Sequence, residues 1–92
     1  MTGEAEAKAV SKAVVRGSGW LLLNGRTRLR VWRAWPSEKD PCSPSETQRF
    51  SAVSEGGSDV DVYVTRHFDL SSYSVSYMDG DRLVNVVSVE AG

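Results

Sequence analysis

The sequence predicts a small α+β protein, with an N-terminal helix packed on a curved antiparallel sheet of five or six strands, a meander or a partly closed barrel. Three observations indicate this class. Helix formers dominate residues 4–16, later segments alternate apolar and polar residues with a period of two, and Asn-Gly and Asp-Gly dipeptides interrupt the alternation. The 92 residues are predicted to form a single domain, 1–92, because a chain of this length supplies one hydrophobic core.

The helix is expected at residues 4–16, after a disordered start at residues 1–3. Thr2 is the candidate N-cap, and acidic residues in the first turn with basic residues later match the helix dipole. The segment Gly17-Ser18-Gly19 is expected to end the helix. The apolar stripe is narrow, so the helix should depend on docking for stability. This stripe consists of Ala7, Val10 and Val14.

A β-hairpin is predicted around Asn24-Gly25, because a type I′ turn needs positive φ at both central residues. In a two-residue turn Leu23 would face Arg26, and Trp20 would face Leu29. One side of this hairpin is predicted to be core, and it comprises Trp20, Leu22, Thr27, Leu29 and Val31. The other side is predicted to be basic and aromatic, and it comprises Leu21, Leu23, Arg26, Arg28, Arg30 and Trp32.

Residues 36–46 contain three prolines and are predicted to be a loop, since proline fixes φ and removes a hydrogen-bond donor. We place a strand at residues 47–54, with a helix as the open alternative. Period-two alternation predicts strands at residues 59–68 and 72–78, and Asp79-Gly80 predicts a turn into a last strand. In that turn the expected partners are Tyr77 with Arg82, Val75 with Val84, and Tyr73 with Val86.

Charge is distributed unevenly along the chain. Residues 13–35 carry five arginines and no acidic residue, whereas the whole chain has a net charge of −1. The excess of arginine over lysine favours planar, bidentate contacts to carboxylates or phosphates. The predicted partner-binding residues are Arg26, Arg28, Arg30, Trp32, Arg33 and Trp35.

These residues predict a non-enzymatic binding module that docks on a protein partner with an acidic surface, since arginine and tryptophan are enriched at interface hot spots. Its size and composition are typical of small inhibitors, immunity proteins and adaptors, including those of phages and bacteria. The alternative function is nucleic-acid binding through the same side chains. A third interpretation is a solvated face, or one paired internally with Asp59 and Asp61.

A homodimer is a secondary hypothesis, in which a flat side of the last hairpin would pack against a second copy. This side comprises Ser72, Ser74, Ser76, Leu83, Asn85 and Val87.

No catalytic residue, metal ligand or cofactor is assigned from the sequence. Cys42 has no neighbouring base that would activate its thiol as a nucleophile. Asp59, Asp61 and His67 share one side of a predicted strand, but their spacing indicates a polar face rather than a metal site. A single cysteine and no apolar leader or span predict a cytoplasmic setting with no membrane partner.

Overall fold

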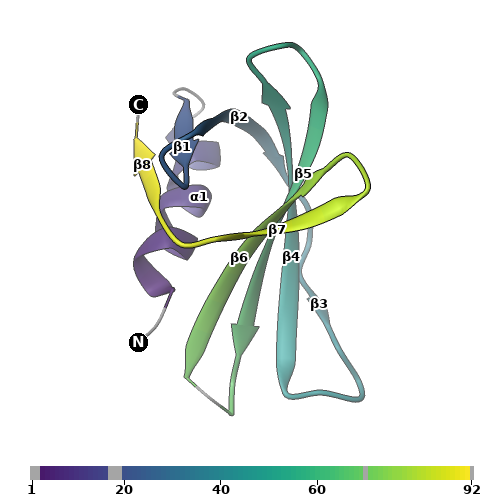
Figure 1. Ribbon diagram of the computed structural model, residues 1–92. Helices are drawn as coiled ribbons and strands as arrows, with labels where there is room; N and C mark the ends of the chain where they lie inside the picture. The colour runs from purple at the N-terminus through teal and green to yellow at the C-terminus, as the bar shows by residue number, and fades with distance from the viewer. Residues whose placement is uncertain (1–2, 17–19, 70, 92) are drawn as a thin grey trace.

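The computed structural model describes residues 3–16, 20–69 and 71–91, in which an N-terminal helix packs on a curled antiparallel sheet (Figure 1). The helix α1 spans Glu4–Arg16. The strands are β1 (Leu21–Leu23), β2 (Thr27–Ala34), β3 (Glu38–Lys39), β4 (Ser45–Ser54), β5 (Asp59–His67), β6 (Ser72–Asp79), β7 (Arg82–Val86) and β8 (Val89–Ala91). Their order in the 8-stranded sheet is β7-β6-β5-β4-β2-β1-β8, with β3 beside β4.

The α+β class with an N-terminal helix on an antiparallel sheet is therefore confirmed, but five or six strands was too few. The short strands β3 and β8 were not predicted. Two or three residues are too few for period-two alternation to become visible in a sequence. Among the described residues, no helix combines the length and the apolar character needed to cross a membrane.

The sheet curls because one segment of chain joins both of its ends. Strand β7 pairs with β6, and β8 pairs with β1 after a break of only two residues, Val87 and Ser88. Asn24, in the β1–β2 turn, ties this break in place. Its Nδ2 donates to the Asn85 carbonyl at 2.9 Å, its Oδ1 accepts from the Val87 N–H at 2.7 Å, and its own N–H donates to the Ser88 carbonyl at 3.0 Å. The result is a half-barrel.

Helix α1 closes the concave side of this half-barrel, where it packs against β2, β6 and β8. Its bounds agree with the predicted residues 4–16, although the proposed N-cap Thr2 and the breaker at residues 17–19 lie outside the described residues. Ala7 and Val10 of the predicted stripe are buried, and the side chain of Val14 lies outside the described part. The largest fully buried side chains of the shared core are Phe50, Leu23, Leu29, Val10, Val62 and Val75.

Gly3, which we predicted to belong to a disordered start, lies directly before α1. Its carbonyl accepts a hydrogen bond from the Ala7 N–H at 3.0 Å, and its φ is 76°. A Cβ on this residue would overlap the carbonyl oxygen of Tyr73 in β6. The glycine therefore lets the start of the helix approach the sheet backbone closely.

The turn between β1 and β2 has the predicted conformation but a different register. Asn24 and Gly25 have φ of 55° and 68°, as a type I′ turn requires, and the Arg26 N–H donates to the Leu23 carbonyl at 3.1 Å. However, Leu23 pairs with Thr27, so the turn contains three residues and Arg26 belongs to it. The predicted pairing of Leu23 with Arg26 was wrong by one residue.

This one-residue shift reverses the two sides of β1, because successive side chains of a strand point to opposite faces. Leu21 and Leu23, predicted to lie on the basic side, are buried in the core. Trp20 and Leu22, predicted to be core, are half-buried. On β2 the side assignment was correct at the buried Leu29 and Val31 and at the exposed Arg28 and Arg30.

The β6–β7 hairpin also departs from its predicted register, but by two residues. Val75 pairs with Val86 and Tyr77 pairs with Val84, so the turn residues are Gly80 and Asp81 instead of Asp79 and Gly80. A shift of two leaves every side chain on its predicted face.

The segment 36–46, predicted to be a loop, contains β3 and the first two residues of β4. Glu38 pairs with Thr47, and Lys39 pairs with Glu46. Both residues of β3 are exposed, and the prolines lie outside the strand. Proline lacks the N–H needed for pairing, so a proline-rich segment can supply only a short strand at the edge of a sheet. Residues 47–54 are a strand, not a helix.

We expect Asn24→Gly to lower the free energy of unfolding by about 1 kcal/mol, because it removes two partly solvated hydrogen bonds while tolerating positive φ. Asn24→Ala should cost about 1–2 kcal/mol more, because alanine resists that backbone conformation. Urea denaturation would measure both losses. Wild-type stability of Asn24→Gly would show that the side chain does not hold the β7–β8 break.

Gly3→Ala and Gly57→Ala form a matched pair, since both add a Cβ at positive φ, 76° and 86°. Nothing lies within 4 Å of a Cβ on Gly57, so this variant should lose only about 1 kcal/mol of backbone strain. Gly3→Ala should lose more, because its Cβ meets backbone that cannot move aside. Equal urea midpoints would contradict the close docking of α1 on β6.

Candidate functional site

Five of the six predicted binding residues lie along β2 or directly after it, and the sixth is separated from them. Arg28 and Arg30 point to the outer, convex face of the sheet. Arg26 is in the β1–β2 turn and lines a hollow with Tyr77 and Arg82. The predicted register had placed Arg26 in one row with Arg28 and Arg30. In the structure Arg26 does not belong to that row.

A β-bulge at Trp32 changes which side chains share the outer face. Val31 pairs with Ala52 and Arg33 pairs with Ser51, so Trp32 is an extra residue in β2. Strict alternation would have placed Arg33 on the core side. The bulge instead brings Arg33 to the outer face beside Arg30 and leaves Trp32 56% exposed.

Trp35 is the anchor of this face. Its Nε1–H donates to Ser51 Oγ at 2.9 Å, and its backbone N–H donates to the Arg49 carbonyl at 2.9 Å. The guanidinium carbons of Arg33 and Arg49 lie 3.6 and 4.5 Å from the centroid of its ring. Both distances are within the range of cation–π attraction, so the indole positions two arginines from neighbouring strands.

Arg49 was missed by the sequence analysis, although a signal for it exists. In β4, Phe50 and Ala52 are buried while Arg49 is exposed, which is the alternation of a strand with one face on the core. The segment was left open between strand and helix, and a helix would have distributed these residues differently. Once β4 is known to be a strand, Arg49 falls on the outer face.

The arginines of this face have few acidic partners within the molecule. Arg28 Nε lies 3.7 Å from Glu55 Oε1, and both side chains are more than half exposed, so this pair contributes little. Among the described residues, no ion pair joins Arg30 or Arg33 to Asp59 or Asp61, although all four lie on neighbouring parts of the outer face. Of the arginines on this face, Arg28 therefore has an internal ion pair, with Glu55. The pairing with Asp59 and Asp61 that the sequence suggested is not present among the described residues.

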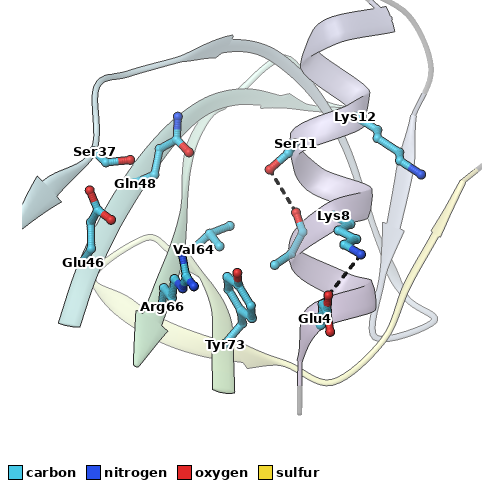
Figure 2. A pocket seen from close by; sticks show the side chains of 11 residues that line it. Glu4, Lys8, Ser11, Lys12, Ser37, Glu46, Gln48, Val64, Arg66 and Tyr73 are labelled. Carbon is cyan, nitrogen blue, oxygen red and sulfur yellow. Dashed lines mark hydrogen bonds and ion pairs between the residues drawn. The ribbon is translucent and has the colours of Figure 1, made fainter. Parts of the chain in front are cut away.

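A second feature is a groove of about 510 Å³ between α1 and strands β4 to β6 (Figure 2). Its helix side includes Lys8, whose Nζ lies 3.0 Å from Glu4 Oε1, and its sheet side includes Gln48, Arg66 and Tyr73. The Arg66 guanidinium carbon lies 5.9 Å from the Tyr73 ring centroid. Charges of both signs line this groove and partly satisfy each other, so it offers no clear preference for one ligand chemistry.

The residues considered for catalysis or metal binding are not assembled into a centre. Cys42 is exposed, and His67 Nε2 lies 3.0 Å from Ser74 Oγ. Within residues 3–16, 20–69 and 71–91, no three potential metal ligands of the His, Cys, Asp or Glu type lie together.

The side chains that share the exposed face of β2 and β4 form what we term the arginine–tryptophan face. It consists of Arg30, Trp32, Arg33, Trp35 and Arg49. Comparisons with protein families, with curated proteins and with solved structures find no match to this chain. The chemistry of the arginine–tryptophan face is therefore the basis on which a function can be inferred.

The stacking of Arg33 on Trp35 can be measured by a double-mutant cycle. Arg33→Met and Trp35→Leu should show a coupling of about 0.5–1 kcal/mol in the free energy of unfolding. The control cycle pairs Arg30→Met with Trp35→Leu and should be additive, because no cation–π pair joins the Arg30 guanidinium to the indole among the described residues. A coupling no larger than that of the control would contradict the stacking.

Proposed function

We propose that the protein is a non-enzymatic binding module that docks its arginine–tryptophan face on an acidic surface of a protein partner. The observation that supports this most is the presence of three guanidinium groups and two indoles on the outer side of β2 and β4. They belong to the exposed Arg30, Trp32, Arg33 and Arg49 and to the half-buried Trp35. Guanidinium groups bind carboxylates in a bidentate manner, and tryptophan supplies apolar area.

Trp32 is the candidate hot spot of this surface. It is a large apolar side chain that is 56% exposed, and the bulge holds its backbone away from regular pairing. Burying an aromatic ring of this size in a partner's pocket is among the largest single contributions to interface affinity. The flanking arginines would then orient the acidic groups around that pocket.

Preorganisation also favours a binding role. Arg33 rests on the Trp35 ring, and that ring is held by Ser51 Oγ. An arginine that is already ordered loses less side-chain entropy when it binds than a freely moving one. A rigid sheet with prepositioned guanidinium groups is suited to an inhibitor, an immunity protein or an adaptor. This choice of protein class rests on the kind of surface alone.

Nucleic-acid binding is the second candidate, and the exposed Trp32 favours it because an indole can stack on a base. Asp59 and Asp61 oppose it, since they lie on the same outer face and would repel phosphates, whereas a protein surface can place basic groups opposite these aspartates and acidic groups opposite the arginines. The net charge of −1 supplies no long-range attraction for a polyanion. A protein partner is therefore the preferred proposal.

Affinity capture from a native extract, with and without nuclease, tests this proposal. Arg30→Glu and Trp32→Ala should each reduce recovery of the bound protein at least tenfold, whereas Arg82→Glu should not. Arg82 is an exposed arginine of β7, outside the arginine–tryptophan face, so it controls for the change of charge.

Nuclease treatment should leave the captured protein unchanged. Retention of the partner by Arg30→Glu would contradict the proposal. Loss of binding after nuclease, together with a steep decrease of affinity between low and moderate salt, would support nucleic-acid binding instead.

A further inference from the structure

We infer that the outer face of β2, β4 and β5 pairs two copies of this chain about a two-fold axis that runs along β4. This inference rests on the proposed function, because it names a second copy of the chain as one partner of the arginine–tryptophan face. The registers of three neighbouring strands support it.

Two rows of side chains cross the outer face at right angles to the strands. In each row β2 contributes an arginine, β4 a small uncharged residue and β5 an aspartate. The first row consists of Arg30, Val53 and Asp59, and the second consists of Arg33, Ser51 and Asp61. The second row exists only because the bulge at Trp32 brings Arg33 to this face.

This arrangement is self-complementary. Strands β2 and β5 lie on opposite sides of β4 at the same spacing, about 4.8 Å. A two-fold axis parallel to β4 therefore places β2 of one copy over β5 of the other. Arg30 and Arg33 then face the aspartates of their own rows, while the outer residues of β4, Val53, Ser51 and Arg49, face their own symmetry mates, as an isologous interface requires.

The curvature of the sheet fits the same geometry. Because the core and α1 occupy the concave side, the outer face is convex, and two convex surfaces touch along a line and separate on either side. Val53 and Ser51 are small enough to lie at the line of contact. The long arginine side chains on β2 can span the widening gap to the short aspartates on β5.

The charged groups needed for this pairing form no ion pair within the described part of one copy, although Arg33 also stacks on the Trp35 ring. Among the described residues, Arg30 and Arg33 have no acidic partner, and Asp59 and Asp61 have no basic one. A two-fold axis at right angles to the strands would instead place the arginines of β2 over those of the other copy, and repulsion between like charges disfavours that arrangement. The contact between convex surfaces is small, so the dimer should be weak and sensitive to salt.

The flat serine side suggested by the sequence is a competing dimer surface. It lies around β6 and β7, where Leu83 and Val87 are 59% and 70% exposed, but Ser74 Oγ already contacts His67 Nε2. This side has no rows of opposite charge that would specify a second copy. Dimerisation through the serine side is the alternative result that the following experiment would detect.

Charge exchange in the full-length chain tests the inference by analytical ultracentrifugation at low salt, with protein up to about 1 mM because a small interface is weak. Wild type should associate reversibly. The double variants Arg30→Asp with Arg33→Asp, and Asp59→Arg with Asp61→Arg, should each associate at least tenfold more weakly, because like charges then face each other. An equimolar mixture of the two should regain at least the wild-type association, since every opposed pair is again complementary.

Circular dichroism would verify that both double variants are folded, and Leu83→Asp provides a control on the serine side that should associate like wild type. A monomeric wild type, or a mixture that fails to associate, would overturn the inference. Loss of association only in Leu83→Asp would also overturn it, in favour of the serine side. A monomeric wild type whose capture of another protein still depends on Arg30 would leave the proposed function intact.

Discussion

The rest of the structure depends on the way residues 82–91 join the two ends of the sheet. This segment pairs first with β6 and then with β1, and the Asn24 amide binds the backbone between the two pairings. The join makes the sheet curl. The concave side then has room for one amphipathic helix and the apolar core, and the convex side is free to carry polar and charged groups.

The bulge at Trp32 is the local feature that adds Arg33 to the exposed groups of this convex side. An unbroken β2 would alternate Arg30 outward, Val31 inward and Arg33 inward, which would bury a guanidinium in the core at high cost. The extra residue lets the strand continue with Arg33 outward. Alternation alone would also direct Trp32 outward, so the bulge adds Arg33 to the side of β2 that already exposes an indole.

The charges of this face explain why an arginine-rich surface does not imply a polyanion as ligand. Strand β4 separates the aspartates of β5 from the arginines of β2. A partner that follows this pattern must carry both signs of charge in a defined order, and a protein surface can do so whereas a phosphate backbone cannot. Specificity would come from the order of the charges, and affinity from the indole of Trp32.

Local patterns in the chain were sufficient to predict the helix at residues 4–16, the positive φ of Asn24 and Gly25, and the outward arginines of β2, because each depends on neighbours a few residues away. The register of strand pairing could not be predicted in the same way. The predicted register of the first hairpin was wrong by one residue, which reversed the two faces of β1, whereas that of the second was wrong by two residues, which left every face correct. Only the tertiary structure decided three other features. They are the bulge in β2, the position of Arg49 on the outer face, and the pairing of residues 82–91 with both ends of the sheet. Each is set by pairing between strands that are distant in sequence, and no local pattern encodes such pairing.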